Sequence, residues 1–343
     1  MATQASGKKL QMVDVARLAG VSVATVSRAL NGSPLINAET TKRVQELARS
    51  LNYSINVSAK NLRIGENKTV AIVIPFDRAT RQAISDPFFL GMLGSLADAL
   101  TELGYDMLLS RVDSEHLDNL AALYDTGRAR GIVVIGQWGH HDQLNALAAR
   151  GVPLVVWGAN LPRQLYCSVG SDNVAGGQKA TEHLLAQGYK RIVFLGNIEL
   201  PEVALRYQGY TNAHQLHGVK LRPALQVNIS FTTQQAKEGV ERLLTQALDF
   251  DAIFASSDLI AMTAISALQA RGLRVPHDVA VVGYDDIEAA AHFHPPLSTI
   301  RQSIDAAGHH LVALLQKIIA SEPAESVLMP TSLVVRDSSS VPT

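Results

Sequence analysis

From residue 70 onward, short apolar runs alternate with longer amphipathic stretches. The apolar runs, which have the length of buried strands, are 70–75, 106–109, 131–135, 153–157, 191–195, 251–255 and 279–285. The amphipathic stretches, which suit helices, are 88–103, 173–187, 234–248, 258–271 and 302–320. Buried strands that alternate with helices form parallel sheets covered on both faces. These runs are too many for one modest sheet, so we predict an α/β body of two doubly wound lobes with parallel sheets.

The ends of the predicted strands indicate where a ligand would bind. In doubly wound sheets, ligands bind beyond the carboxyl ends of the strands, which here means a cleft between the lobes. Asp285 ends the run 279–285, and its carboxylate could accept hydrogen bonds from hydroxyl groups. Trp157 ends another run, and Gln137 and Gln302 are amide candidates for the same cleft. An Asp at a strand end can equally cap a turn or a helix, so this reading stays open.

Composition sets broad limits on the class of protein. The chain has 343 residues, of which 47% are hydrophobic and 18% are charged, as in ordinary globular proteins. No apolar run reaches the roughly 18–20 residues that span a bilayer. The start of the sequence has no apolar segment typical of a secretory signal. The single cysteine, Cys167, allows no internal disulfide, and we therefore expect a reducing, cytoplasmic setting.

Charge is distributed unevenly along the chain. Residues 1–63 contain nine Lys and Arg against three Asp and Glu, a formal charge of +6, whereas the remainder carries −7. A small basic segment before an acidic body suggests that a polyanion binds this segment alone. A solvated basic surface would give the same balance, so charge by itself does not decide.

The basic segment has the pattern of three short helices. Val13, Ala16 and Ala19 lie at helical spacing before the break at 20–22, where Ser22 is a suitable N-cap for a second helix through Leu30. Asn37 is expected to cap a third helix that ends near residue 51. Two short helices joined by a Gly-containing turn are typical of a helix-turn-helix, although a generic three-helix module has similar elements. The second helix presents hydroxyls, small side chains and one arginine, the chemistry that a DNA major groove accepts.

At this point the chain resembles the LacI/GalR, lactose-repressor-like, family of bacterial transcriptional regulators. The resemblance rests first on the run DVARLAGVSVATVSRALNGSPLINAETTKRVQELARSLNYSINVSAKNL, at residues 14–62. Further motifs follow in the expected order: SDN at 171–173, GYDD at 283–286, PPLSTIRQ at 295–302 and LVVRDS at 333–338. The resemblance implies a headpiece at 1–54, a hinge helix or linker at 55–67 and an effector-binding, dimerisation body at 68–341. We predict that lobe 1 spans about 68–170 and 300–327, and lobe 2 about 171–297 and 328–341.

The resemblance also implies roles for residues of the headpiece and hinge. Base edges would be read by Val23, Ala24 and Arg28. Phosphates would be contacted by Ser22, Thr25, Ser27 and Asn31. The minor groove would be entered by hinge residues Asn56, Ala59, Lys60 and Leu62, with Leu62 as the wedge. A two-fold homodimer then implies a near-palindromic operator.

Two hinge residues depart from the pattern that the family often shows. Ile55 stands where a proline often precedes the asparagine, and Lys60 stands where an arginine often follows the alanine. Lys60 keeps the positive charge but lacks the bidentate fork of arginine. These departures bear on affinity for DNA more than on the mode of binding.

In the body, the resemblance points to a small-molecule effector, for which a sugar is the expectation. Arg206 matches the arginine that reaches into the ligand cleft, and Phe89 and Phe231 match aromatic walls, although either phenylalanine could instead be core. Together with Gln137, Trp157, Asp285 and Gln302 they form the predicted effector site. Gly158 stands where relatives often have an aspartate, so that sugar contact would have to come from elsewhere. A glucoside or maltose-type saccharide fits this composition, and purines or nucleosides remain open.

Other functions find little support in the sequence. We expect no catalytic residues, no metal and no cofactor, because no phosphate-binding glycine motif follows a strand and no Cys, Asp or Glu set completes the histidine pairs. A sugar-binding protein without a DNA role would not account for the basic segment of the first 63 residues. The sequence leaves open whether the effector is an inducer or a corepressor, and which operator is bound.

Overall fold

The computed structural model describes residues 11–30, 33, 35–51, 67–76, 82–246 and 249–340. These residues form two compact units that divide between Asn67 and Lys68. We call the first unit the headpiece and the second the body, and each is described by itself. Within the described residues, no helix combines the length and apolarity needed to cross a membrane.

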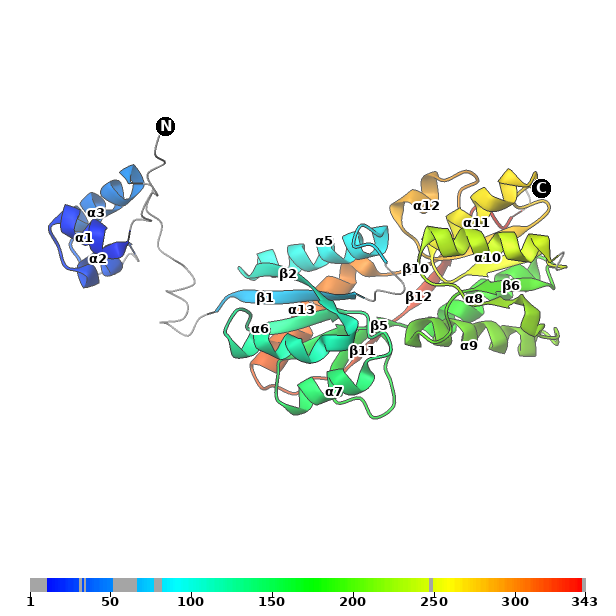
Figure 1. Cartoon of the computed structure of the whole chain (residues 1–343), viewed down its shortest axis with the longest axis horizontal. Coiled ribbons are helices and arrows are strands. Elements are labelled where there is room, and N and C mark those ends of the chain that lie inside the picture. Colours follow the sequence, from blue (N-terminus) through cyan, green and yellow to red (C-terminus); the bar gives the residue numbers. More distant parts are fainter. Residues whose placement is uncertain are drawn as a thin grey trace, which may run out of the picture. The chain divides into compact units, whose positions relative to one another are not determined.

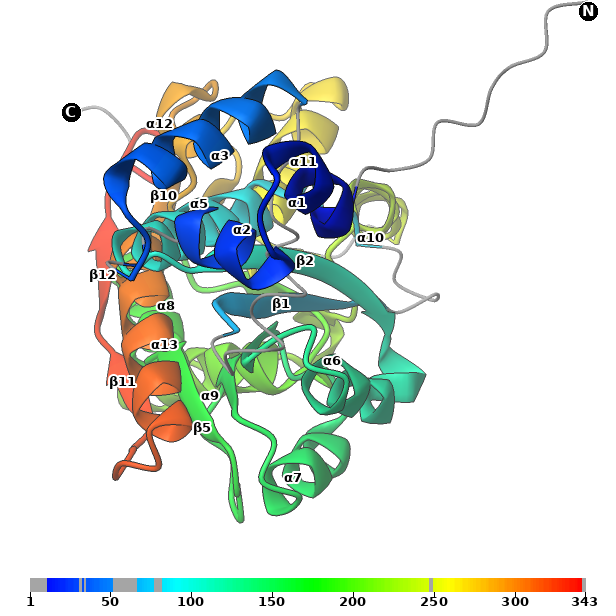
Figure 2. The same cartoon turned by 90° about the vertical axis from the view of Figure 1, so that its left-hand side faces the viewer.

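The headpiece contains the three helices that the sequence predicts, α1 (Met12–Ala19), α2 (Val23–Leu30) and α3 (Ala38–Ser50) (Figures 1 and 2). Gly20 ends α1 with a φ of 63°, a left-handed conformation that glycine adopts without a steric penalty. Ser22 begins α2, because its Oγ accepts a hydrogen bond from the Thr25 backbone N–H at 3.1 Å. Asn37 caps α3 in the same way, with its Oδ1 2.8 Å from the Thr40 nitrogen. Both predicted N-caps are therefore confirmed.

One small apolar core holds these helices together. Its fully buried members include Val15, Val26, Ala29 and Val44. Val21 packs against this cluster from the turn. With three short helices and so few large side chains, the headpiece has a small core, and caps contribute a substantial part of its stability.

The first sheet of the body is all parallel, with strand order β11-β5-β4-β3-β1-β2. Its strands are β1 (Thr69–Phe76), β2 (Asp106–Asp113), β3 (Gly131–Ile135), β4 (Leu154–Trp157), β5 (Cys167–Ser171) and β11 (Val327–Met329). One face is covered by α5 (Pro87–Glu102) and α13 (Ile304–Ile319). The other face is covered by η1 (Ser114–Leu120), α6 (Ala121–Asp125) and α7 (His141–Ala149) (Figure 1). We call this half lobe 1.

The second sheet has strand order β12-β10-β9-β8-β6-β7 and is parallel except for β12. Its strands are β6 (Ile192–Leu195), β7 (Gln226–Val227), β8 (Ala252–Ala255), β9 (Ala280–Asp285), β10 (Ser298–Gln302) and β12 (Thr331–Val334). One face packs on α8 (Asn173–Ala186) and α9 (Pro201–Leu216). The other packs on α10 (Thr233–Thr245), α11 (Asp258–Ala270) and α12 (Glu288–His292) (Figure 1). This half is lobe 2, and the predicted pair of doubly wound lobes is confirmed.

The chain passes between the lobes three times, and we call these segments the crossings. They lie between β5 and α8 at residues 171–173, between β10 and α13 at 302–304, and between β11 and β12 at 329–331. The lobe bounds predicted at about 300 and about 328 lie within two residues of these crossings. Strand β10 pairs with β12 up to residue 302, and β11 pairs with β5 up to residue 329.

Candidate functional site

The outer surface of α2 carries the residues predicted to read bases. Val23, Ala24 and Arg28 are exposed, whereas Val26 and Ala29 on the opposite side of the helix are buried. The helix is thus divided into a face that holds the headpiece together and a face free for a partner. Val23 and Ala24, the two smallest exposed side chains of α2, lie in its first turn, and their size would let the helix backbone approach a groove closely.

The hydroxyl residues of α2 already have partners within the headpiece. Ser22 Oγ lies 2.9 Å from Thr25 Oγ1 in addition to capping the helix, so this pair is fixed in position at the helix N-terminus. Ser27 is half-buried. The predicted DNA contacts at Asn31, Asn56, Ala59, Lys60 and Leu62 lie outside the described residues and stay predictions.

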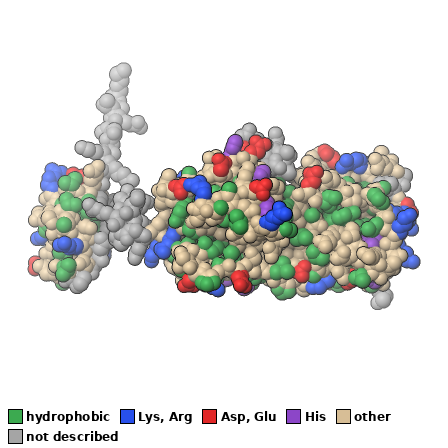
Figure 3. All heavy atoms as spheres, turned by 90° about the horizontal axis from the view of Figure 1, so that it is seen from below, with side chains coloured by type: hydrophobic (Ala, Val, Ile, Leu, Met, Phe, Trp, Pro, Cys, Tyr) green, Lys and Arg blue, Asp and Glu red, His purple; other side chains and the backbone are tan. Residues whose placement is uncertain are grey.

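The headpiece surface carries an excess of positive charge among its described residues. Arg17, Lys42, Arg43 and Arg49 are exposed together with Arg28, and Figure 3 shows Lys and Arg side chains spread over one of its faces. Asp14 lies 3.7 Å from Arg17 and offsets part of this charge. Such a surface attracts the phosphate backbone of DNA without regard to sequence.

The body contains a cavity between the two lobes, with lining residues from both of them. The described residues that line it are Gln82, Asp86, Phe88, Phe89, Ile135, Gly136, Trp138, Trp157, Leu200, Glu202, Arg206, Phe231, Ser257 and Asp285. We call this cavity the cleft. Five predicted effector residues line it, namely Phe89, Trp157, Arg206, Phe231 and Asp285. Trp157 and Asp285 came from the strand-end argument, whereas Phe89, Arg206 and Phe231 came from the family resemblance.

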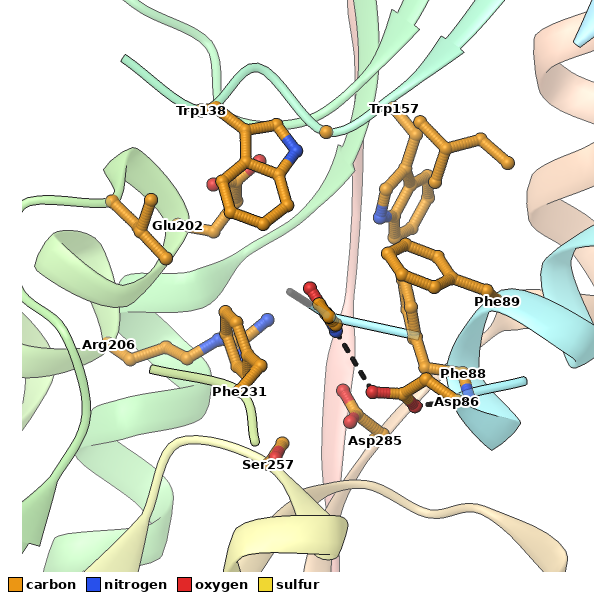
Figure 4. Close-up of a pocket in the computed structure, with 14 residues that line it drawn as sticks. Asp86, Phe88, Phe89, Trp138, Trp157, Glu202, Arg206, Phe231, Ser257 and Asp285 are labelled. Carbon is orange, nitrogen blue, oxygen red and sulfur yellow. Dashed lines mark hydrogen bonds between the residues drawn. The ribbon is translucent and has the colours of Figure 1, made fainter. Parts of the chain in front are cut away.

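Aromatic rings form much of the cleft wall. Phe88 packs edge-on against Phe89 with ring centroids 5.7 Å apart, and lies 6.4 Å from Trp157. Trp138 faces this group across the cleft, and Phe231 lies beside Arg206 (Figure 4). Both tryptophans of the chain line the same cavity. Flat apolar faces on more than one side of a cavity suit a ligand that has ring-shaped apolar surfaces.

Arg206 supplies the positive charge among the described lining residues. Its Nε donates to Asn173 Oδ1 at 2.8 Å, its Nη1 donates to the carbonyl oxygen of Ser256, and its guanidinium lies 3.8 Å from the centre of the Tyr284 ring. These contacts use part of its donor capacity and fix its plane. The side chain is 6% exposed, so a donor that remains free is directed at the cleft rather than at open solvent (Figure 4).

Three carboxyl groups line the cleft at Asp86, Glu202 and Asp285. Burial raises the pKa of Asp285 to about 7, against the lowering effect of Arg206 and with a further raising effect of Asp86. Burial likewise raises the pKa of Asp86 and of Glu202. Asp285 also has a φ of 123°, a strained conformation of the kind that persists at binding sites.

Asp258, which does not line the cleft, lies behind Asp285. Its carboxyl is fully buried and accepts hydrogen bonds from Thr299 Oγ1 at 2.5 Å and from the Ile287 backbone N–H at 2.9 Å. Burial and the nearby Asp285 raise the pKa of Asp258 well above its ordinary value. Two neighbouring buried carboxyls cannot both ionise cheaply, so one of them holds a proton near neutral pH.

Gln137 was predicted to contact the effector, and the structure corrects this. Its amide is fully buried, with Nε2 donating to the Ala159 carbonyl at 2.6 Å and to Tyr166 Oη at 2.9 Å, and Oε1 accepting from the Ala159 N–H at 2.9 Å. It lies against Gly158, where a Cβ would come within 2.7 Å of the Gln137 amide carbon. Gln137 therefore occupies the space that a side chain at position 158 would need.

Gln302 is the second correction. It does not line the cleft; it is buried, and its Nε2 donates to Asp285 Oδ1 at 2.7 Å. A residue at a strand end points toward or away from a cleft according to its place in the pleat, which sequence position alone leaves unresolved.

Several lining residues escaped the sequence reasoning. Glu202 lies one helical turn before Arg206, so the spacing of four along α9 could have identified it. Trp138 follows the strand that ends at Ile135, a signal of the kind used for Trp157. Asp86 and Phe88 lie at the start of α5, where Asp86 caps the helix by accepting from the Phe88 N–H at 3.0 Å.

Comparison with known proteins agrees with this architecture. Residues 11–56 match the model for bacterial regulatory proteins of the lacI family, and residues 181–339 match a periplasmic binding protein-like domain. The HTH-type transcriptional regulator CelR of Thermobifida fusca is 33% identical over 331 residues, which cover 94% of this chain and 96% of CelR. This chain belongs to the LacI family.

Other LacI-family members are similar at comparable levels. The HTH-type transcriptional repressor PurR of Pasteurella multocida is 31% identical over 334 residues, covering 95% of this chain and 97% of PurR. A solved CelR–cellobiose complex shares 31% identity with a TM-score of 0.72, covering 96% of this chain and all of the other. A lac repressor dimer bound to operator has a TM-score of 0.82 at 24% identity, over 97% of this chain and 99% of that one, which supports the fold. The chain is thus a DNA-binding regulator of transcription with a LacI-type fold.

Proposed function

We propose that this LacI-family regulator is a homodimeric repressor of carbohydrate-utilisation genes whose operator affinity is controlled by a neutral saccharide in the cleft. The observation that carries the proposal is the cleft itself, where aromatic faces surround one guanidinium and three carboxyl groups. Sugars have apolar C–H faces that pack on aromatic rings and hydroxyl edges that exchange hydrogen bonds with such groups. Of saccharides, a glucose-based disaccharide is the first candidate, because the CelR structure at 31% identity is a complex with cellobiose.

Within the cleft, we assign the hydroxyl-binding roles to two buried groups. Arg206 would donate to sugar oxygens, since its plane is already fixed by Asn173 and Tyr284. Asp285 would accept from sugar hydroxyls, and Gln302 holds its carboxyl in place. Phe89 and Trp157 would then pack against the ring.

The proposed regulation is a linkage between the cleft and DNA. A saccharide that favours one closure of the lobes would change the spacing of residues 56–62 in the two protomers, which we assign to the minor groove. Ligand affinity and operator affinity are then reciprocal. Val23, Ala24 and Arg28 on α2 would read a near-palindromic operator. Because its proposed partner is genomic DNA, we place the protein in the cytoplasm, and we assign it no enzymatic activity.

The tryptophans provide a direct test of the effector. Because Trp138 and Trp157 both line the cleft and are the only two tryptophans of the sequence, the intrinsic fluorescence of the full chain reports on this cavity. Cellobiose, maltose and glucose should be titrated alongside hypoxanthine and adenosine. We expect a saturable change with a disaccharide that is lost in Arg206→Ala and retained in Gln178→Met, a substitution at a half-buried residue that does not line the cleft. A response confined to the purine compounds would refute the sugar and favour the alternative ligand class.

DNA recognition is tested independently of the ligand. Fragments selected from a random library by the full chain should share a near-palindromic motif, and Arg28→Ala should lose discrimination between this motif and random DNA. Recovery of no common motif would contradict sequence-specific binding, whatever the outcome for the sugar.

A further inference from the structure

Each of the two buried polar groups assigned to the ligand is hydrogen-bonded to a residue of a crossing. Arg206 donates from Nε to Asn173 Oδ1 at 2.8 Å, and Asn173 is the first residue of α8 after the crossing from lobe 1. Asp285 accepts from Gln302 Nε2 at 2.7 Å, and Gln302 is the last residue of β10 before the crossing back to lobe 1. Neither Asn173 nor Gln302 lines the cleft.

Asn173 extends the first of these contacts into lobe 1. Its Nδ2 donates to the carbonyl oxygen of Ser171 at 3.0 Å, and Ser171 is the last residue of β5 in the sheet of lobe 1. The neighbouring Asp172 donates its N–H to the Met329 carbonyl at 2.8 Å, which joins this crossing to the one between β11 and β12. One asparagine side chain thus connects the cleft arginine, on α9 of lobe 2, to a strand end of lobe 1.

Gln302 has a comparable place at the second crossing. Two residues after it, α13 begins, and α13 packs on the sheet of lobe 1 through Ala307 and Leu311. A shift of Asp285 would act on the end of β10 directly before this helix. The four side chains Asn173, Gln302, Arg206 and Asp285 are 3%, 4%, 6% and 7% exposed, so water does not readily replace a broken bond.

We propose that Asn173 and Gln302 are positioning residues that transmit the contacts of Arg206 and Asp285 to the crossings and so couple occupancy of the cleft to the relative orientation of the lobes. This rests on the proposed function, because it presumes that a ligand binds the cleft. A ligand that draws Arg206 or Asp285 toward itself then displaces Asn173 or Gln302. This displacement moves the crossings and so changes the angle between the lobes, because the hydrogen bonds involved are buried.

Two substitutions separate coupling from ligand binding. Gln302→Met keeps the approximate shape and removes the donor to Asp285. Asn173→Asp keeps the acceptor for Arg206 but removes the donor to Ser171, so the arginine stays in place while its connection to lobe 1 is lost. Gln178→Met is the matched control, because the side-chain bond of Gln178 among the described residues runs along α8, to Glu182 at 2.8 Å.

The deciding measurement is the factor by which saturating cellobiose changes the affinity of the full chain for the DNA motif that wild type selects. Coupling factors of roughly 5–150 are typical. We expect Gln302→Met and Asn173→Asp to bind cellobiose, by tryptophan fluorescence, yet to show a factor close to 1, while Gln178→Met keeps the wild-type factor. A wild-type factor in both variants at saturating cellobiose would overturn the proposal, because it would leave the two residues a structural role alone.

Hydrogen exchange supplies a second measurement that needs neither ligand nor DNA. In the unliganded chain, the Asp172 amide should exchange faster in Asn173→Asp, and the Ala307 amide, which bonds to the Ser303 carbonyl, should exchange faster in Gln302→Met. Unchanged exchange at both amides would also overturn the proposal. If wild type itself does not respond to cellobiose, the proposed effector is wrong, and the exchange measurement still decides whether these bonds hold the crossings.

Discussion

The buried carboxyl of Asp285 makes stability and ligand binding oppose each other, and Asp285→Asn tests this. In the ligand-free body, the carboxyl lies next to Asp258 and away from bulk solvent, and its pKa is raised by burial to about 7. Asparagine has nearly the same shape, tolerates positive φ and can still accept the hydrogen bond from Gln302. The substitution therefore removes the cost of ionising this site while it keeps the packing.

The sign and size of the effect follow from linkage. The unfolded chain releases the proton near its ordinary pKa of 3.8, whereas the folded chain keeps it up to about 7. Wild type therefore loses stability as the pH rises through this window and loses no more above it. About three pKa units correspond to ~4 kcal/mol, of which about 3 kcal/mol is lost between pH 5 and pH 8. Asp285→Asn should not show this loss.

Thermal unfolding of the full chain at pH 5 and pH 8, followed by tryptophan fluorescence, measures the effect. We expect the melting temperature of Asp285→Asn relative to that of wild type to rise by on the order of 5–10 °C from pH 5 to pH 8. Asp286→Asn is the control of opposite sign, because Asp286 pairs with Arg301 at 2.6 Å and Arg336 at 2.7 Å and its loss should destabilise. A gap between Asp285→Asn and wild type that does not change with pH would refute the reasoning.

Three further predictions follow from local geometry. Gly158→Ala should lower the melting temperature of the body and the affinity of the cleft for cellobiose, because the new Cβ would lie 2.7 Å from the Gln137 side chain. Adding Gln137→Ala should restore part of the affinity, and a double variant without this recovery would contradict the clash. Asn37→Ala should destabilise the headpiece by about 1 kcal/mol, because it removes the 2.8 Å hydrogen bond from the Thr40 N–H that caps α3. Urea unfolding measures this change, and an unchanged midpoint would show that the cap is dispensable. Arg28→Ala should lower affinity for the selected motif by about 1–3 kcal/mol and leave random DNA nearly unaffected in binding assays, and an equal loss on both would make it a phosphate contact.

The headpiece was the most predictable part of the chain from sequence. Its helix boundaries depend on local chemistry, where a capping side chain and a glycine turn satisfy backbone groups a few residues away. Ser22, Asn37 and Gly20 carry those signals and sit where the sequence predicts. Val23, Ala24 and Arg28 would take up their roles only on DNA, so these roles stay predictions.

In the body, two of the elements that went unpredicted, α9 and β10, bury polar groups. Helix α9 places Val203, Arg206, Tyr210 and His214 on its buried side, so its inward face does not read as an apolar stripe. Strand β10 has the sequence STIRQ, in which Ile300 is the single large apolar residue. Patterns of hydrophobicity detect elements that are held by apolar packing. They miss α9 and β10 because polar side chains interrupt the apolar pattern of both elements.

The two glutamines show where sequence reasoning about the cleft had to end. Both follow or end strands at the edge facing the cleft, and both were predicted to bind the effector, yet Gln137 bonds to Ala159 and Gln302 bonds to Asp285. Strand-end position determines which edge of a sheet a residue joins, whereas its partners depend on chain segments distant in sequence. For Gln302 this changes the role rather than removing it. As proposed above, a side chain that holds the Asp285 carboxyl from behind, at the point where the chain leaves lobe 2, would affect both ligand binding and the lobe angle through one hydrogen bond.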